Sequence, residues 1–103
     1  MAVKIEEFDW DEGNKSKNKL KHKVSVKEAE QVFFDKNSVQ FEDVRHSQTE
    51  QRIIIIGLTR KKRFLHISFT IRSKKIRVIS ARDADKKEKR YYANEKTKNK
   101  NNS

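Results

Sequence analysis

The chain has 103 residues, of which 40% are charged and 33% hydrophobic, and its formal net charge at pH 7 is +11. A chain of this length forms one domain with a modest core, and its positive charge favours a polyanion or an acidic protein as partner. The lack of cysteine excludes disulfides, and no apolar run approaches the roughly 20 residues that span a membrane, so we expect a cytoplasmic protein with no membrane partner.

The N-terminal third is expected to form a short strand followed by two helices. Residues 3–8 alternate weakly between apolar and polar, which indicates a strand. A polar, lysine-rich helix is expected over 11–22, with Asp11 as its N-cap. The second helix begins at Ser25, because Ser25 and Glu28 form a capping box and the apolar residues that follow recur at helical spacing.

The middle of the chain contains the candidate strands. Runs of β-branched and aromatic residues predict strands over 39–42, 51–58, 63–72 and 76–82. The third run alternates most regularly, with apolar side chains on one side and mixed side chains on the other. Because the last three strands are joined by short links, we expect an antiparallel meander.

The C-terminal part is expected to hold one helix and a tail. Ser80 and Asp83 form a capping-box pattern, which predicts a helix from Asp83 to about Ala93. Residues 94–103 are rich in Lys and Asn and contain no apolar residue, which is typical of a disordered basic tail. The expected architecture is α+β: a small antiparallel meander of three to four strands plus a short N-terminal strand, with two N-terminal helices and one C-terminal helix. A single domain would cover 1–93, followed by the tail over 94–103.

The residue types exclude several chemistries and are compatible with RNA cleavage. The three histidines are scattered and the chain has two glycines, so we expect no metal site, no phosphate-binding glycine loop and no cofactor. Metal-independent RNA cleavage, in which the ribose 2′-hydroxyl attacks the adjacent phosphate, needs a base, an acid and cations. The side chains that could serve are His46, Glu50 and His66 as acid or base, and Arg63, Arg72, Arg77 and Arg82 as phosphate clamps.

The same residue types also fit other roles. An RNA-binding sheet without catalytic activity, with Phe64 and His66 as stacking platforms, would look similar. Arg77 and Arg82 could equally be solvated side chains at the edge of the sheet. Composition and spacing therefore leave catalysis and simple binding open.

A series of short motifs resembles the BrnT family of toxins. The motifs keep the family's order and spacing over 8–92, and they include Phe8-Asp9-Trp10-Asp11, Lys21-His22, Asp43-x-Arg45-His46-Ser47, Glu50-x-Arg52, Ile76-Arg77-Val78-Ile79-Ser80-Ala81-Arg82 and Glu88-x-Arg90. Two places depart from the pattern: Lys23 and the hairpin 72–75 lack the glycine that is common in relatives.

This resemblance implies the toxin of a type II toxin–antitoxin system, with a RelE-like fold, that cleaves RNA and inhibits translation. It also implies a BrnA-like ribbon-helix-helix antitoxin that neutralises the toxin and binds operator DNA. We accordingly expect a catalytic group of Arg72, Arg82, His46 and Glu50, and an RNA-binding group of Lys15, Lys21, His22, Arg63, His66, Arg77 and Arg90. The alternatives are a non-catalytic nucleic-acid-binding module and a degenerate toxin that serves only as an antitoxin-docking or DNA co-repressor subunit.

Overall fold

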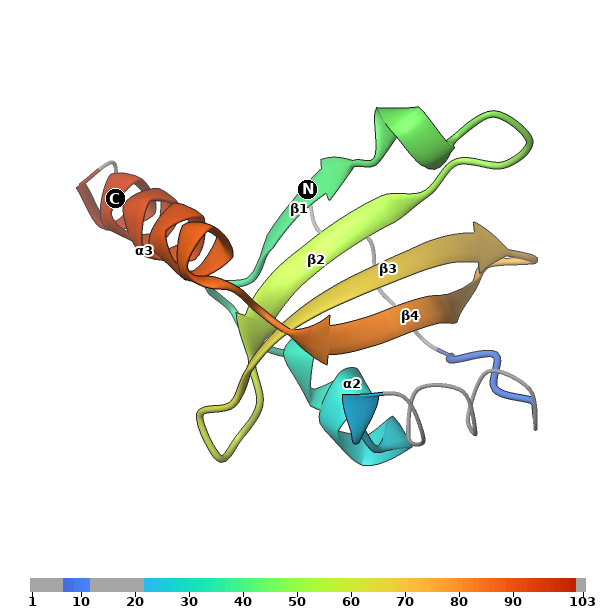
Figure 1. The fold of residues 1–103 in the computed structure, drawn as a ribbon, viewed down its shortest axis with the longest axis horizontal. Helices are drawn as coiled ribbons and strands as arrows, with labels where there is room; N and C mark the ends of the chain where they lie inside the picture. The colour runs from blue at the N-terminus through green and yellow to red at the C-terminus, as the bar shows by residue number, and fades with distance from the viewer. Residues whose placement is uncertain (1–6, 12–21, 102–103) are drawn as a thin grey trace.

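Four antiparallel strands form the centre of the molecule, and helices lie against both faces of the sheet (Figure 1). The computed structural model describes residues 7–11 and 22–101. In chain order the elements are α2 (Val26–Val32), β1 (Val39–Glu42), the 3-10 helix η1 (Val44–His46), β2 (Ile53–Leu58), β3 (Phe64–Arg72), β4 (Lys75–Asp83) and α3 (Lys86–Asn101). The strands are ordered β1-β2-β3-β4, so the predicted meander and the α+β class are confirmed. No helix in the described part of the chain is long and apolar enough to cross a membrane.

The sheet buries a different apolar core on each face, because side chains alternate in direction along every strand. Helix α2 covers the larger core, whose main strand residues are Ile55, Leu65, Ile67, Phe69 and Val78. On the opposite face, Tyr92 of α3 packs with Ile54 and Ile56 of β2. This second core lies at one end of the sheet, where α3 crosses it (Figure 1). By strand register, the rest of that face carries polar side chains such as Ser68, Thr70 and Arg82.

Gly57 and Asp35 join the two cores. A Cβ atom at Gly57 would lie 3.0 Å from Cγ1 of Val32, so a larger residue would require Val32 to move by a few tenths of an ångström. The Asp35 carboxylate accepts hydrogen bonds from the backbone N–H of Leu58 at 2.9 Å and from the hydroxyl of Tyr92 at 2.8 Å. This half-buried carboxylate thereby ties the end of α2 to β2 and to α3. Burial of Tyr92, together with its hydrogen bond to Asp35 and the charge of Asp35, raises the pKa of Tyr92.

The helices differ from expectation in number and position. The described residues hold two α-helices where three were expected, because most of the segment 11–22 lies outside them. The capping box at Ser25 is confirmed: its Oγ accepts from the backbone N–H of Glu28 at 3.1 Å. The predicted capping box of Ser80 and Asp83 is wrong, because β4 continues to Asp83 and pairs with β3. The helix cap is instead formed by Asp85 and Glu88, each of which accepts a hydrogen bond from the backbone N–H of the other.

Helix α3 is also longer than the predicted helix over 83–93. It begins at Lys86 and runs to Asn101, across most of the segment for which a disordered tail is expected. Lysine and glutamate are good helix formers, so their propensity supports helical turns without a packed core.

At the other end of the chain, only the last residues of the expected strand 3–8 are described, and Phe8 makes a single parallel bridge to Ile76. The RelE-like architecture and the domain boundary at residue 93 remain predictions.

Two left-handed residues form the turn between β3 and β4. Ser73 has a φ of 50° and Lys74 a φ of 65°, and positive φ at both central residues is what a type I′ hairpin turn requires. Lys23, which precedes α2, has a φ of 55°. Both are places where the sequence resemblance implies a glycine, and the backbone there takes a left-handed conformation with a lysine or serine side chain.

We predict that Lys74→Gly stabilises the protein by about 1 kcal/mol, because a side chain in the left-handed region costs about 1–2 kcal/mol that glycine avoids. The melting temperature should rise by about 4–8 °C per kcal/mol for a domain of this size. Lys75→Gly is the matched control: Lys75 lies in β4, where glycine should lower stability by about 0.5–1 kcal/mol. A lower melting temperature for Lys74→Gly would contradict the turn assignment.

A polar sheet face as candidate active site

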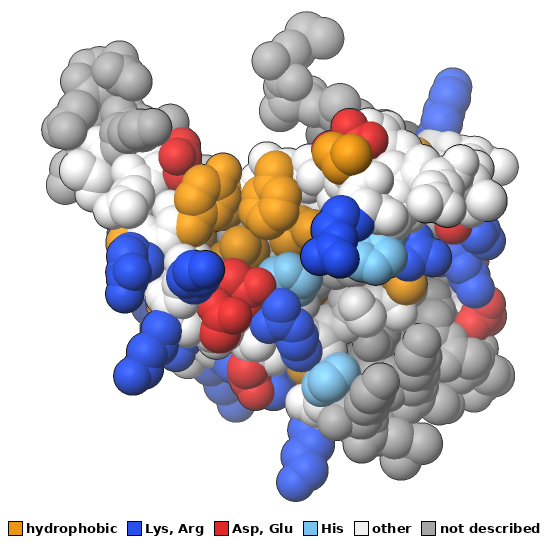
Figure 2. All heavy atoms as spheres, turned by 45° about the horizontal axis from the view of Figure 1, so that its top comes forward, with side chains coloured by type: hydrophobic (Ala, Val, Ile, Leu, Met, Phe, Trp, Pro, Cys, Tyr) orange, Lys and Arg blue, Asp and Glu red, His pale blue; other side chains and the backbone are white. Residues whose placement is uncertain are grey.

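A bulge in β4 places the two arginines of this strand on one face of the sheet. The register pairs His66 with Arg82 and Thr70 with Arg77, and it shifts by one residue between these pairs, so that Ile79 is the extra residue. Five residues separate Arg77 from Arg82, so in a regular strand their side chains would point to opposite faces. The bulge therefore gathers both guanidinium groups on the polar face, among acidic, basic and histidine side chains (Figure 2).

Arg82, Glu88 and His66 form a cluster on this face. The guanidinium of Arg82 donates two hydrogen bonds to the carboxylate of Glu88, at 2.9 and 2.8 Å. The same carboxylate lies 3.4 Å from Nε2 of His66. Glu88 is positioned by the first turn of α3, where the backbone N–H of Asp85 donates to its Oε1 at 2.9 Å. One carboxylate therefore holds a strand arginine and a strand histidine next to each other.

The cluster contains a neutral imidazole beside a charged pair. The side chain of His66 is 15% exposed; burial, followed by the nearby positive charge of Arg82, lowers its pKa, and Glu88 offsets this only in part. For Glu88, burial raises the pKa, but the hydrogen bonds from Arg82 and from the Asp85 backbone outweigh it and the net pKa is lowered. The hydrogen bonds to Glu88 raise the pKa of Arg82. A neutral imidazole can accept a proton, and the carboxylate at 3.4 Å can stabilise the imidazolium that results.

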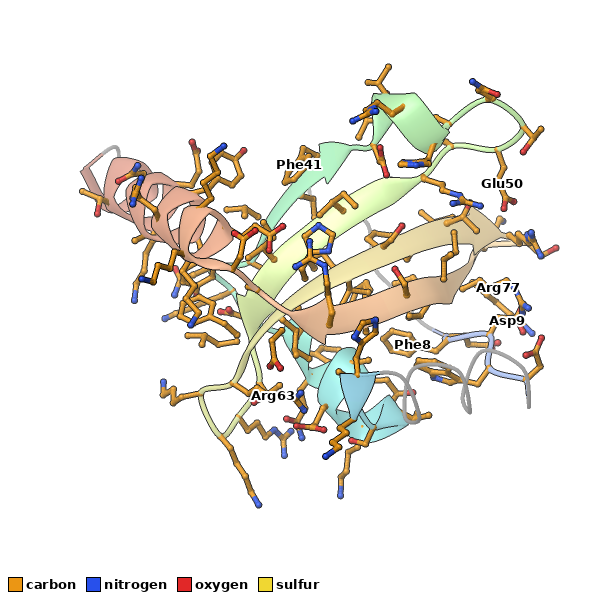
Figure 3. All side chains as sticks on the ribbon, in the orientation of Figure 1. Phe8, Asp9, Phe41, Glu50, Arg63 and Arg77 are labelled. Carbon is orange, nitrogen blue, oxygen red and sulfur yellow. The ribbon has the colours of Figure 1, made fainter. Side chains whose placement is uncertain are left out.

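Glu50 and Arg72 form a second ion pair at the other end of the polar face. Figure 3 shows this end of the face, where Glu50 and Arg77 are labelled. Nε and Nη2 of Arg72 each donate to Glu50 at 3.0 Å. The hydrogen bond from Arg72 lowers the pKa of Glu50, which makes this carboxylate a poor base. Nη2 of Arg77 donates to Asp11 at 2.6 Å. Nearby, Nε of Arg52 is buried and has no hydrogen-bond partner among the described residues.

His46 belongs to a third pair, at the β1 edge of the sheet. Its Nδ1 lies 2.9 Å from Oδ2 of Asp43, and its side chain is 62% exposed. The hydroxyl of Ser47 holds the loop by accepting from the backbone N–H of Arg52 at 2.9 Å and donating to the carbonyl of Asp43 at 2.7 Å. A carboxylate that fixes one imidazole nitrogen and leaves the ring exposed is an arrangement suited to acid–base chemistry.

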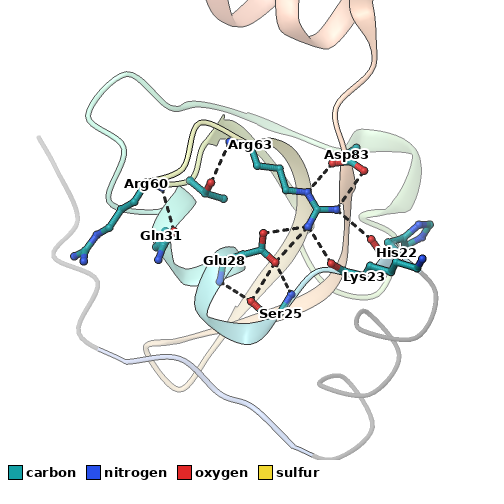
Figure 4. Close-up of polar contacts among 9 residues, drawn as sticks. His22, Lys23, Ser25, Glu28, Gln31, Arg60, Arg63 and Asp83 are labelled. Carbon is teal, nitrogen blue, oxygen red and sulfur yellow. Dashed lines mark hydrogen bonds and ion pairs between the residues drawn. The ribbon is translucent and has the colours of Figure 1, made fainter.

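Arg63 has a structural position instead (Figure 4). Nη1 donates to the carbonyl of Lys23 at 2.9 Å and to Glu28, whose Oε2 lies at 3.1 Å. Nη2 donates to the carbonyl of His22 and to Asp83, each at 3.2 Å, and Nε donates to Asp83 at 2.8 Å. These contacts use all five N–H bonds of the guanidinium. The hydrogen bonds that Arg63 donates to Asp83 and Glu28 raise the pKa of Arg63 despite partial burial. No donor of Arg63 is left for a phosphate.

The expected site residues are therefore divided among several places. The structure brings Arg72 together with Glu50, and Arg82 together with His66 through Glu88, while His46 pairs with Asp43. His22 is partly buried beside the Arg63 network, and Arg90 is exposed on α3. Lys15 and Lys21 lie outside the described residues.

Three residues of these clusters were absent from the predicted site, although each lies in a motif of the sequence. Glu88 belongs to Glu88-x-Arg90 and follows Asp85 at capping-box spacing, while Asp43 and Arg52 belong to the motifs that contain His46 and Glu50. Glu88 pairs with Arg82, six residues earlier and across a strand–helix junction, and no standard helix or strand spacing predicts such a pair. Within residues 7–11 and 22–101, no three His, Asp or Glu side chains are grouped so as to hold a metal ion.

Comparison with known families finds one match. A family model described as "Ribonuclease toxin, BrnT, of type II toxin-antitoxin system" matches residues 10–88. No curated protein matches the chain. The matched range includes the Arg82–Glu88–His66 cluster and the Glu50–Arg72 and His46–Asp43 pairs, and it ends within the first turn of α3.

We predict that Arg63→Gln lowers the free energy of unfolding by about 2–3 kcal/mol, because it removes charge-assisted hydrogen bonds that join three parts of the chain. Arg60→Gln, an exposed side chain in the same turn, is the control and should change stability by less than about 0.5 kcal/mol. Urea denaturation measures both. Equal stability of the two variants would show that Arg63 does not hold the fold together.

We also predict that His66 titrates below pH 6.5 in an NMR titration of its imidazole protons. Glu88→Gln removes the charge that favours the imidazolium, so the midpoint should fall further, whereas Arg82→Gln removes the opposing cation and should raise it. Arg72→Gln, which alters an arginine of the separate Glu50 pair, should leave the midpoint unchanged. A wild-type midpoint at or above 6.5 would contradict the effect of burial.

Proposed function

We propose, since the chain belongs to the BrnT family of ribonuclease toxins of type II toxin–antitoxin systems, that it cleaves RNA internally without a metal ion. The observation that carries this proposal is the cluster on the polar face, where one carboxylate lies 3.4 Å from a neutral imidazole and accepts two hydrogen bonds from a permanently charged guanidinium. Such a set supplies a base and a cation, which are two of the three groups that transesterification of RNA needs.

In the proposed reaction, Nε2 of His66 accepts the proton of a ribose 2′-hydroxyl, and the 2′-oxygen attacks the adjacent phosphorus. The bond from phosphorus to the 5′-oxygen breaks, and that oxygen takes up a proton, so the products end in a 2′,3′-cyclic phosphate and a 5′-hydroxyl. Negative charge grows on the phosphoryl oxygens in the transition state, where the guanidinium of Arg82 stabilises it. Glu88 holds Arg82 in place and stabilises the imidazolium of His66.

The remaining expected catalytic residues take narrower roles in this proposal. His46 remains the second acid–base candidate, because Asp43 orients its ring and its side chain is exposed. It lies at the β1 edge, apart from the Arg82–Glu88–His66 cluster, so the 5′-oxygen takes its proton from solvent in this proposal. Arg72 would bind a phosphate of the bound strand, while Glu50 positions Arg72 and does not act as a base, since its pKa is lowered. Arg77 adds positive charge along the same face. Nε of Arg52, which is buried and has no hydrogen-bond partner among the described residues, adds a further cation near Glu50.

Membership of a type II system implies a protein antitoxin. We propose that it is a ribbon-helix-helix protein that neutralises the toxin and carries it to operator DNA, that the toxin inhibits translation by cutting RNA, and that it acts in the cytoplasm. The net charge of +11 is complementary to RNA and also to an acidic antitoxin segment. Lys15, Lys21, His22 and Arg90 remain candidates for RNA binding under this proposal.

We expect the purified wild-type chain to shorten unstructured RNA in the presence of EDTA and to leave 2′,3′-cyclic phosphate ends. His66→Asn should lower the rate about 10²–10⁴-fold, and Arg82→Gln about 10²–10³-fold. Lys61→Gln, an exposed cation outside the clusters, serves as the control and should retain wild-type activity. Loss of activity in EDTA, or products with 3′-hydroxyl ends, would overturn the metal-independent mechanism.

Growth after induced expression separates the alternatives. Arrest by the wild type that is relieved by its antitoxin and by Arg82→Gln supports the toxin. Protection of RNA from a second nuclease without any shortening would identify a binding module. Binding of the antitoxin with neither arrest nor RNA cleavage would identify a degenerate toxin.

A further inference from the structure

A shallow aromatic hollow lies beside the proposed catalytic cluster. It has a volume of about 430 Å³ and is lined by Phe41, Ile56, Lys87, Glu88 and Tyr91, which we call the aromatic hollow. Ile56 of β2 is buried and forms its floor. The rings of Phe41 and Tyr91 meet edge to face, with centroids 5.6 Å apart and an interplanar angle of 87°. Because these two rings are perpendicular, a flat ligand can stack on one while it meets the edge of the other.

The two aromatic rings of the hollow are exposed to solvent. Phe41 is 41% exposed and Tyr91 is 39% exposed, whereas the next residue of α3, Tyr92, is buried. Figure 2 shows apolar side chains gathered beside charged and histidine side chains on one face of the molecule. Exposed aromatic rings that surround a hollow are typical of a binding surface.

Glu88 connects the aromatic hollow to the catalytic cluster. Its side chain lines the hollow, and its carboxylate binds Arg82 and lies 3.4 Å from His66. The Glu88 carboxylate already accepts three hydrogen bonds, because Oε1 accepts from Arg82 and Asp85 and Oε2 accepts from Arg82. Little acceptor capacity is left to read a base by hydrogen bonding, so recognition in the hollow falls mainly to the aromatic rings.

We propose that the aromatic hollow binds one unpaired nucleobase of the RNA, next to the phosphate at Arg82; this inference rests on the proposed ribonuclease function. A base has a flat π-face that suits Phe41 and Tyr91, and the phosphate attached to its nucleoside would meet Lys87 at the rim. Lys87 and Tyr91 are four residues apart on α3, so both side chains point to the same side of the helix.

Charge favours an RNA base over an apolar side chain of a protein as the occupant. Lys87 borders the hollow on one side, and the arginines of the polar face follow on the other. A nucleotide within an RNA strand has a flat base and a phosphate on each side of its ribose, so it matches this arrangement of cations around an aromatic site. Stacking tolerates every base, so the subsite selects single-stranded over paired RNA and does not fix a sequence.

The test compares Phe41→Leu and Tyr91→Leu, which remove an aromatic ring but keep an apolar side chain, with Tyr91→Phe, which keeps the ring. Phe34→Leu is the matched control, because Phe34 is an exposed phenylalanine that packs against Phe8, away from the hollow. Affinity is measured by fluorescence anisotropy with a short unstructured RNA that is 2′-O-methylated throughout and cannot be cleaved. Cleavage of the unmodified RNA and the melting temperature are measured in parallel.

We expect each leucine variant of the hollow to weaken RNA binding and raise KM by about 5- to 150-fold, the range for loss of one base–aromatic stack, with kcat nearly unchanged. Tyr91→Phe, which keeps the ring, should bind RNA more tightly than Tyr91→Leu, and Phe34→Leu should behave as wild type. An abasic site at the stacked position should weaken binding to the wild type but not to Tyr91→Leu, which a merely structural role would not produce.

Two results would overturn the inference while leaving the ribonuclease in place. In the first, the wild type cleaves RNA and the leucine variants keep its affinity and KM. In the second, the leucine variants lose affinity for the antitoxin alone, which would assign the hollow to the protein partner. If the wild type neither binds nor cleaves the RNA, the proposed function itself fails.

Discussion

The guanidinium of Arg63 is the point on which the rest of the structure depends. It donates to the carbonyls that precede α2, to the first turn of α2 and to the end of β4. The start of α2, the residue before β3 and the end of β4, which are far apart in the sequence, therefore meet at one side chain. A chain with few apolar residues gains little from burial alone, and directional, charge-assisted hydrogen bonds supply part of what a larger core would provide. Because Arg63 fixes Asp83, it also fixes the strand end from which Arg82 points to the opposite face.

The polar face keeps several arginines close together by pairing each with a carboxylate. Arg82 is held by Glu88, Arg72 by Glu50 and Arg77 by Asp11, and without such partners their mutual repulsion would act against folding. Pairing also fixes the direction of each guanidinium before a ligand arrives, which lowers the entropy cost of binding an anion. An incoming phosphate must compete with the carboxylate for the N–H groups of the arginine. The ion pairs that stabilise the polar face therefore also limit the affinity of this face for a phosphate.

Helix α3 decides where chemistry is possible on this face. It covers one end of the face with Tyr92, places Glu88 at the margin of the covered area and leaves Tyr91 at the surface. At that margin His66 is buried enough to stay neutral and still close enough to a carboxylate to hold a proton. The half-buried His66, the charged Glu88 and the exposed ring of Tyr91 therefore lie close together, because all three are at the boundary between the part of the sheet that α3 covers and the part that it leaves exposed.

The sequence by itself determined the strands, the meander, the first capping box and the family, because hydrophobic alternation, local capping and motif order are properties of neighbouring residues. It also identified Arg72, Arg82, His46 and Glu50 as polar residues near strand ends. Only the tertiary structure decided which of them meet. The bulge at Ile79 brings Arg77 to the face of Arg82, and Arg63 is saturated by partners twenty or more residues away. A spacing pattern assumes a regular strand and relates only residues that are near in sequence. It therefore cannot predict a one-residue shift in register or an ion pair with a carboxylate far away in the sequence.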